Sequence, residues 1–414
     1  MTSRTTHHLH LDRRLTRRAV FQGGAALAAV SLAGCANDDG GGEPAPIAEL
    51  PVAVGPTQVP PAPTQPPIGF PVAGYLDPTR WTGRSLVIAS PAFGEYLDAV
   101  TIAFFDAFAM ATGATVRHQD FGREGVAGVI DQVESGETVW DVLLVPGEEV
   151  LPLAQAGYLE PIDYNVVDPT ALYAELMFQH GVGARMYSTT IVFPPAADPP
   201  ADWTSFWDVS TTPGTRALRK SPIGTLEFAL LADGVAMPDL YPLDTSRAFA
   251  ALDRIRDTTI FYEDSKQPVE LVRAGQVALA SAWNVRTDLP DVVSLVSPQW
   301  TGGMVSADSW IIPRGAPNQD VGMSFINFAT RAVPSANFSR LQSFGPVNQD
   351  ALALLRPDII ERLPNAPGRL ALQFFQNWGF WAEFRESLIV QFNDWLLNPV
   401  ATPPARTRTF GVDR

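Results

Sequence analysis

The most informative segment for the fold class is Arg84-Ser85-Leu86-Val87-Ile88-Ala89-Ser90, a short apolar run between Gly83 and Pro91. A run of this length that is apolar on both faces is typical of a buried strand in a parallel sheet. Apolar residues then recur at helical spacing as far as Phe108, before Gly113, and glycine commonly ends helices. We therefore predict a strand followed by a helix.

The alternation of strand and helix continues along the chain. A second short strand is predicted at Thr115–His118, a helix from about 124 to 134, and a third strand at Val139–Val145. The order βαβαβ predicts a parallel sheet with helices on both faces. Ligands of such sheets bind at the carboxyl ends of the strands, so a binding site is expected first at Pro91–Tyr96 and Pro146–Glu149.

The rest of the chain predicts a second lobe. Four hundred and fourteen residues exceed the roughly 250–300 that one hydrophobic core serves. From about Asp202 the pattern restarts, with a helix at Ser246–Ile255 capped by Asp244. The other predicted elements are a helix near Leu226–Ala232, strands at Val277–Trp283 and Ser309–Ile312, a helix at Met323–Ala332, and a helical, aromatic C-terminal part with Trp378, Trp381 and Trp395.

Composition excludes several classes of protein. The chain is 46% hydrophobic and 18% charged, which is typical of a globular protein. Its formal net charge is -15, and a chain this acidic lacks the basic face that nucleic acid requires, so no nucleic-acid partner is expected. The single cysteine, Cys35, cannot form a disulfide within the chain.

The first 34 residues resemble an export signal. Four arginines between Arg13 and Arg18 precede an apolar run from Ala19 to Ala33, which is shorter than the roughly 20 residues of a membrane-spanning helix. The segment around Arg17-Arg18 resembles the twin-arginine export pattern, and Leu32-Ala33-Gly34-Cys35 resembles a bacterial lipobox. We expect Cys35 to be lipidated, with an ordinary signal whose cysteine is unmodified as the alternative.

The segment after Cys35 predicts a tether. Ten prolines fall within residues 44–71, and no helical or strand period is present there. Proline-rich chain is extended at about 3.1 Å per residue, so a lipid-anchored domain would stand several tens of ångströms from the membrane.

Catalytic and metal-binding motifs are absent from the sequence. Only His118 and His180 follow the signal, neither has a partner at metal-ligand spacing, and no cofactor or metal is expected. The fragment Gly181-Val182-Gly183 lacks the third glycine of a dinucleotide fingerprint. Glu148-Glu149 is interpreted first as a pair of charges at a helix N-terminus. Because carboxylates alone can hydrolyse glycosides, a secreted carboxylate-dependent hydrolase remains the alternative of another class.

The sequence resembles those of the solute-binding proteins of ABC importers. It combines an export signal, two predicted α/β lobes and no recognisable set of catalytic residues. The segments Trp140–Pro146, Ala156–Asp163, Trp203–Asp208 and Asp308–Asn318 stand in an order that resembles the spermidine/putrescine-binding branch. The resemblance spans about residues 84 to 400.

The resemblance implies a periplasmic-binding-protein fold of type II, with a hinge between two doubly wound lobes. The solute would be held in the cleft as the lobes close, and closure is a population shift that the ligand favours by contacting both lobes. The expected organisation is a signal peptide at 1–34, a tether at 35–82, lobe 1 at 84–188 plus 308–350, and lobe 2 at 189–307 plus 351–400.

The resemblance also implies ligand-binding residues. The family's aromatic-x-Glu-Tyr element after the first strand matches Phe93, Glu95 and Tyr96. In such an element Glu95 would pair with an ammonium group, while the rings would stack on an alkyl chain or a cation for about 0.5–2 kcal/mol. Trp283 matches a cleft tryptophan, and Asp308 matches a cleft aspartate.

Glu149, in the loop after Pro146, and Gln376, in Gln376-Asn377, complete the predicted ligand-binding set. Structural interpretations stay open for these residues. Phe93 and Tyr96 would be buried aromatics at the start of a surface helix, and Trp283 would be a core tryptophan.

Three positions depart from the polyamine-binding pattern. Ser306 stands where an aromatic is expected, Arg219-Lys220 replaces acidic residues, and the loop after Pro146 carries Glu148-Glu149 in place of a tyrosine. A dication in a dry cleft needs a carboxylate at each end, because an unpaired buried charge costs several kcal/mol. Arg219 or Lys220 near the site would favour a solute with a carboxylate or phosphonate group.

The sequence thus predicts a non-enzymatic, lipid-anchored solute-binding protein on the periplasmic or extracytoplasmic face of the membrane. It would capture a small solute, with a polyamine as the first candidate, and deliver it as a monomer to the subunits of an ABC permease. Amino-acid-like, opine-like and sugar solutes remain open.

Overall fold

In the computed structural model, which describes residues 69, 71–91, 94–122 and 125–398, the predicted βαβαβ motif opens the folded chain. Strand β1 (Ser85–Ser90) pairs in parallel with β2 (Thr115–Asp120) and with β3 (Val142–Pro146). Leu86 and Ile88 of β1 are fully buried, as expected for the central strand of a parallel sheet. The parallel order is therefore confirmed.

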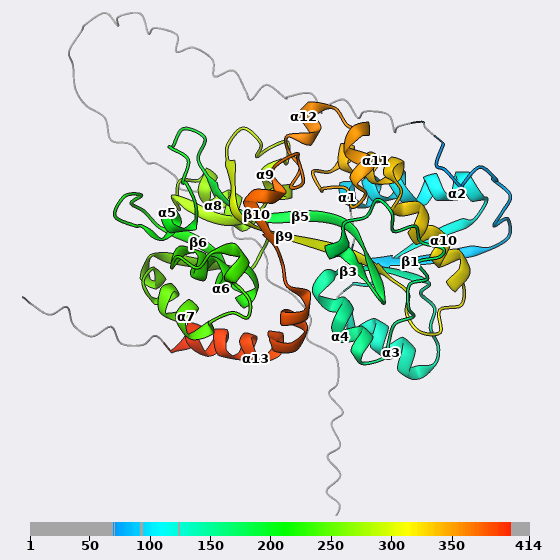
Figure 1. Cartoon of the computed structure of the whole chain (residues 1–414), viewed down its shortest axis with the longest axis horizontal. Helices are drawn as coiled ribbons and strands as arrows, with labels where there is room; N and C mark the ends of the chain where they lie inside the picture. The colour runs from blue at the N-terminus through cyan, green and yellow to red at the C-terminus, as the bar shows by residue number, and fades with distance from the viewer. Residues whose placement is uncertain (1–68, 70, 92–93, 123–124, 399–414) are drawn as a thin grey trace, which may run out of the picture. The chain divides into compact units, whose positions relative to one another are not determined.

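Figure 1 labels the α-helices and several of the strands of the described chain. The remaining strands are β4 (Met177–Phe178), β5 (Gly181–Phe193), β6 (Arg216–Arg219), β7 (Thr259–Tyr262), β8 (Leu279–Trp283), β9 (Ser297–Ile311) and β10 (Gln373–Phe375). The α-helices are α1 (Gly94–Val100), α2 (Asp106–Thr112), α3 (Ala127–Ser135), α4 (Val150–Gln155), α5 (Trp203–Trp207), α6 (Pro222–Ala232), α7 (Thr245–Asp253), α8 (Gln267–Arg273), α9 (Asn284–Thr287), α10 (Gln319–Ala329), α11 (Ala332–Leu341), α12 (Pro357–Ile360) and α13 (Trp378–Leu397). A π-helical segment, η1 (Thr101–Phe105), joins α1 to α2, and Gly113 ends α2 in the left-handed conformation.

Two long strands connect the two halves of the sheet. The strand order is β2-β1-β3-β9-β5-β8-β6-β7, so β5 and β9 lie side by side at its centre (Figure 1). They pair antiparallel, and their register shifts between Gly183 and Arg185 and again between Thr189 and Ile191. The fold is the two-lobed periplasmic-binding-protein fold of type II, in which these central strands join two separately packed lobes.

Each half of the sheet has its own hydrophobic core. The first core surrounds β1 and β3 and includes Phe108 and Phe325. The second lies around α6 and α7 and includes Trp203 and Phe392. A small separate cluster joins residues 351–363 to Ala336 of α11, across the boundary predicted at residue 350.

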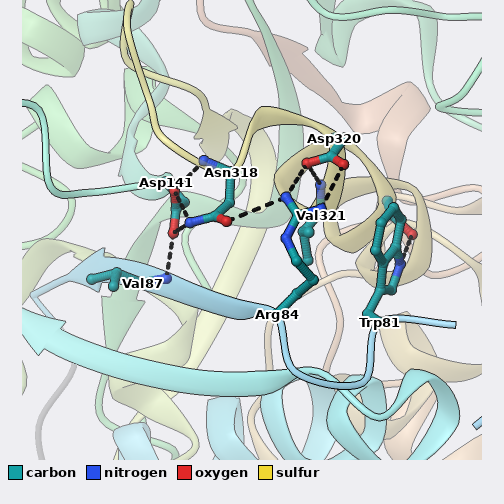
Figure 2. Close-up of polar contacts among 8 residues, drawn as sticks. Trp81, Arg84, Val87, Asp141, Asn318, Asp320 and Val321 are labelled. Carbon is teal, nitrogen blue, oxygen red and sulfur yellow. Dashed lines mark hydrogen bonds and ion pairs between the residues drawn. The ribbon is translucent and has the colours of Figure 1, made fainter. Parts of the chain in front are cut away.

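A buried aspartate ties the first strand to a distant loop, as Figure 2 shows. Asp141 is fully buried, and its carboxylate accepts hydrogen bonds from the backbone N–H of Val87 at 2.7 Å and of Asn318 at 2.8 Å. The side chain of Asn318 also donates to this carboxylate and accepts from Arg84, which pairs in turn with Asp320. The network fixes the start of α10 against β1.

Part of the segment predicted as a tether is packed against the first lobe. Tyr75 is buried, and its hydroxyl donates to the carbonyl oxygen of Ser324 at 2.6 Å and accepts from the Asn327 amide at 3.0 Å. Trp81 donates to the Ser324 hydroxyl at 3.3 Å. An aromatic residue with a polar tip is stabilised where both parts find partners. The predicted signal peptide, the lipidation site Cys35 and most of the predicted tether lie outside the described residues.

The final long helix, α13, contacts both cores. Trp378 belongs to the first core, whereas Trp381 and Trp395 belong to the second. Among the described residues, no helix is long and apolar enough to cross a lipid bilayer.

Candidate functional site

A partly enclosed pocket lies where strands of both halves end around the central pair β5 and β9. About 350 Å³ of space free of protein atoms lies between its walls, and part of this space is open solvent. Its polar lining consists of Glu148, Thr189, Arg219, Thr225, Ser281, Ser306 and Gln376, and its aromatic and apolar lining of Tyr187, Ile223, Phe228, Trp283 and Met304.

Glu148 brings a carboxylate to the pocket from the turn after β3, the 3-10 helix η2 (Gly147–Glu149). Its Oε2 atom is buried and has no hydrogen-bond partner in the described part of the chain. Burial, together with the like charges of Asp308 and Glu149, raises the pKa of Glu148 to about 7, although a backbone hydrogen bond and the charge of Arg219 lower it. The protein therefore stabilises the ionised form of this carboxylate less well than water does.

Arg219 brings a cation from the end of β6, in the other half of the sheet. Its guanidinium carbon lies 5.0 Å from the centroid of the Trp283 ring, a cation–π distance. Within the described ranges, the guanidinium makes no ion pair or hydrogen bond. Tyr187 packs edge-on against Trp283 at 5.3 Å, so two aromatic rings form a wall beside the cation.

Gln376 adds a neutral amide at the end of β10. It is buried, and its Oε1 atom accepts a hydrogen bond from the Ser306 hydroxyl at 2.8 Å. Its Nε2 atom is buried without a partner among the described residues and lines the same pocket. The amide is therefore held by Ser306 on one side and left unbonded on the other.

The predicted residues Asp308 and Tyr96 meet at a neighbouring cluster instead of in the pocket. Asp308 pairs with the buried Arg185, whose Nε atom donates to Oδ2 at 2.7 Å. The Arg185 guanidinium carbon lies 4.4 Å from the Tyr96 ring and 4.5 Å from the Phe344 ring. The charge of Asp308 is thus compensated inside the protein.

Glu149 and Glu95 point elsewhere. Glu149 forms a two-pronged ion pair with Arg385 of α13, at 2.7 and 3.1 Å. Glu95 is exposed in the first turn of α1 and does not line the pocket, and Phe93 lies outside the described residues. Of the predicted set, Trp283 and Gln376 line the pocket.

The two basic residues that depart from the polyamine pattern have different roles. Arg219 faces the pocket, whereas Lys220 is exposed and pairs with Glu263 at 2.6 Å. Arg219 is the last residue of β6 and Lys220 follows the strand, so the two neighbouring side chains have different surroundings.

The opposite charges that remain uncompensated at the pocket define its chemistry. Asp308 is paired with Arg185, and Glu149 with Arg385, which leaves Glu148 and Arg219 as the ionic groups of the lining without an ion pair in the described chain. The described residues contain no cluster of histidine, cysteine and acidic residues suited to a metal. The arrangement can hold a molecule with a cationic and an anionic end.

Glu149, the residue predicted from the sequence to bind the ligand, lies outside the pocket, whereas its neighbour Glu148 lines it. No signal in the sequence separates the two, because the choice depends on Arg385, 236 residues further along. Tyr187 was missed because strand β5 was not predicted. The sequence named Arg219 or Lys220 as the group that would favour a solute carboxylate, and of these two Arg219 lines the pocket.

A two-lobed α/β fold with a pocket between strand ends of both halves is the architecture of a solute-binding protein. The sequence matches the family described as bacterial extracellular solute-binding protein over residues 103–368, and the chain belongs to this family.

Individual relatives agree with this assignment. The chain is 32% identical over 302 residues to the gamma-aminobutyric acid-binding protein of Pseudomonas aeruginosa PAO1, covering 71% of this chain and 86% of the relative. An ABC transporter substrate-binding protein from Bradyrhizobium japonicum USDA 110 superposes with a TM-score of 0.70 at 30% identity, covering 76% of this chain and all of the other. The protein AgtB from A. tumefaciens R10, in complex with agropinic acid, superposes with a TM-score of 0.64 at 32% identity, covering 77% and 100%.

These relatives are binding proteins of transporters and not enzymes. The chain is accordingly a solute-binding component of an ABC transporter, which captures a small solute and delivers it to a permease.

Proposed function

We propose that the solute is amino-acid-like, with an amine at one end and a carboxylate at the other, and that γ-aminobutyrate is a representative ligand. Glu148 would bind the ammonium and Arg219 the carboxylate. The observation that carries this proposal is the presence of these two opposite, internally unpaired charges in one pocket.

The charge balance favours a zwitterion over a singly charged solute. An ammonium beside Glu148 would supply the opposite charge that its buried carboxylate lacks, and a carboxylate would satisfy the fork of Arg219. A solute with only one of these groups would leave the other protein charge unpaired in a partly dry site, which costs several kcal/mol.

The pocket walls suit a short apolar spacer between the two charged ends. Trp283, Phe228 and Met304 line the pocket together with the two charged residues. Methylene groups between an amine and a carboxylate would pack on these side chains, with burial contributing about 0.8 kcal/mol for each methylene. The name of the Pseudomonas relative supports the same class of solute.

The polyamine hypothesis, and with it membership of the spermidine/putrescine branch, receives less support. A diamine would place its second ammonium toward Arg219, and like charges at close range repel. The carboxylates of Glu149 and Asp308 already have arginine partners. An opine-like solute remains the second candidate, because the AgtB structure contains agropinic acid.

The remaining parts of the proposal concern the cell and the whole chain. We infer export by a twin-arginine-type signal, lipid anchoring at Cys35, and action as a monomer on the outer side of the membrane. The solute would lie between lobe 1 (84–188 plus 308–350) and lobe 2 (189–307 plus 351–400), which close around it on a hinge. Loss of palmitate labelling in Cys35→Ser would support the anchor, and labelling that survives would refute it.

A thermal-shift panel tests the solute class. The panel contains γ-aminobutyrate, butylamine, butyrate, putrescine and agropinic acid, each titrated to saturation. A ligand at 100 times its dissociation constant should stabilise the protein by about 2.7 kcal/mol. We expect γ-aminobutyrate to bind, with butylamine and butyrate weaker by about 30-fold or more, since truncating one partner of a buried charge pair costs about 2–5 kcal/mol.

Variants assign the two ends of the solute. Arg219→Met should weaken γ-aminobutyrate binding and leave butylamine binding nearly unchanged. Glu148→Gln should also weaken γ-aminobutyrate binding, but it should leave butyrate binding nearly unchanged. Lys220→Met is the matched control, because it removes the adjacent cation outside the pocket. Putrescine binding more tightly than γ-aminobutyrate, with no loss on Arg219→Met, would establish the polyamine alternative.

A further inference from the structure

The turn that carries Glu148 is held tightly by the start of α13. A methyl group added at Gly147 would lie 2.9 Å from the Trp378 ring and 2.8 Å from the carbonyl oxygen of Ala307. The Trp378 indole N–H also donates to the carbonyl oxygen of Glu175 at 3.3 Å. The Gly147–Glu149 turn is therefore enclosed between β9 and the first turn of the helix.

Arg385 holds the other end of the same turn. It lies seven residues after Trp378, so both side chains project from one face of the helix. Its two terminal nitrogens bond separate oxygens of Glu149, and both side chains are largely shielded, with exposed fractions of 24% and 21%. Two parallel bonds fix the orientation of a carboxylate as well as its position.

The same helix is also anchored in the second lobe. The Trp381 indole donates to Glu227 of α6 at 2.7 Å, and the Trp395 indole donates to Asp253 of α7 at 2.8 Å. Arg256 also bonds the carbonyl oxygen of Leu396 at 2.9 Å. The helix is thus a fixed support for the turn, and Arg385 is the charged link between them.

The charges around Glu148 give this link an electrostatic role. Glu149 and Asp308 oppose ionisation of Glu148, and Arg219 favours it. The hydrogen bonds and the charge of Glu149 raise the pKa of Arg385, and the charge of Glu148 also raises it. The guanidinium therefore interacts with both carboxylates. Without Arg385, the negative charge of Glu149 would act on its neighbour uncompensated.

We propose that Arg385 is a positioning residue for Glu148: by pairing with Glu149 it fixes the turn against α13, favours the ionised form of Glu148 and leaves this carboxylate free to bind the solute. The benefit for an amine-bearing solute rests on the function proposed above. The effect on the Glu148 carboxyl group does not, and it can be measured in the protein without ligand.

The test is a carbon NMR titration of the full chain labelled at the glutamate carboxyl carbon. The Glu148 signal is assigned by its loss in Glu148→Gln. In Arg385→Gln the titration midpoint of Glu148 should rise by about one pH unit, because a nearby opposite charge lowers a carboxyl pKa by about 1–3 units. In Arg385→Lys, which restores the positive charge, the midpoint should lie between those of the wild type and Arg385→Gln.

A second variant predicts the opposite sign. Glu149→Gln removes the like charge and leaves Arg385 next to Glu148, so the midpoint should fall below that of the wild type. Arg356→Gln is the matched control, because it breaks an exposed two-pronged pair with Asp358 outside the site. A merely structural role for Arg385 would shift both site variants in the same direction.

Equal midpoints in wild type and Arg385→Gln, or shifts of the same sign in Arg385→Gln and Glu149→Gln, would overturn the proposal. Calorimetry with γ-aminobutyrate separates this result from the proposed function. Shifts of the expected signs together with no γ-aminobutyrate binding would retain the role of Arg385 and reject the solute. Normal γ-aminobutyrate binding with an unmoved midpoint would retain the solute and reject the role of Arg385.

Discussion

The affinity for an amine-bearing solute should fall steeply below neutral pH because of Glu148. Burial, followed by the charges of Asp308 and Glu149, raises the pKa of this carboxyl group to about 7, from an ordinary value of 4.5. An ammonium binds the ionised carboxylate, so a protonated Glu148 must first release its proton. Protonation therefore competes with binding.

The size of the effect follows from the pKa. Above about pH 8 most Glu148 is ionised and the affinity should be constant, whereas each pH unit below 7 should weaken binding about tenfold, or about 1.4 kcal/mol. Between pH 8 and pH 5 the loss is on the order of 100-fold. The charges of γ-aminobutyrate itself do not change in this window, because a carboxyl and an alkylammonium group titrate near 4 and above 10.

Isothermal titration calorimetry with γ-aminobutyrate at pH 5, 6, 7 and 8 measures this dependence. At pH 7, measurements in two buffers of different ionisation enthalpy should show release of about half a proton for each solute bound. Glu148→Gln should bind weakly with little dependence on pH, while Lys220→Met should keep the wild-type slope. Equal affinities at pH 5.5 and pH 8 in the wild type would refute the assignment of Glu148 as the amine ligand.

Three further predictions concern stability. Burial raises the pKa of Glu227 to about 7, so the free energy of unfolding should fall by up to about 3 kcal/mol as the pH rises from about 4.5 to 7. In urea unfolding, Glu227→Gln should show a weaker dependence of this free energy on pH than the wild type, and the same dependence in both proteins would contradict the prediction. Asp141→Asn should lower the free energy of unfolding by about 3 kcal/mol, because an amide N–H₂ would face a backbone donor; a loss below 1 kcal/mol in urea would be inconsistent with the network. Tyr75→Phe should cost about 1 kcal/mol in thermal unfolding, and no loss would argue against its bond to Ser324.

Much of the fold could be predicted because local patterns and tertiary packing agree there. The strands β1, β2 and β3 are short, apolar or alternating runs between turn residues, and their parallel pairing follows from the intervening helices. The cap of α7 was also predicted correctly, because Asp244 accepts a hydrogen bond from the backbone N–H of Arg247 at 3.0 Å. These features depend on neighbours that are close in sequence.

Of the central strands, only the end of β9 was predicted, as the strand at Ser309–Ile312, and β5 was not predicted. Strand β5 begins with Gly181-Val182-Gly183, and β9 contains Gly302-Gly303, which locally resemble loops. Both strands are stabilised by pairing with each other and with strands far away in the chain, and this overrides their weak propensity. Gly183 is required by packing, since a methyl group there would lie 2.8 Å from Leu176.

The ligand class depends on which charges remain after the protein has paired its own. Asp308 is compensated by Arg185 over 123 positions, and Glu149 by Arg385 over 236 positions, so spacing in the sequence cannot show that either carboxylate is occupied. A count of the acidic residues near the cleft therefore overstates its affinity for cations. The net charge of -15 is equally misleading, because it includes carboxylates that are already paired. Once the internal pairs are removed, the remaining carboxylate and guanidinium come from opposite halves of the sheet. Under the proposed function, a solute that joins them would contact both lobes through charges that neither lobe can satisfy alone, and this would be the differential interaction that closure requires.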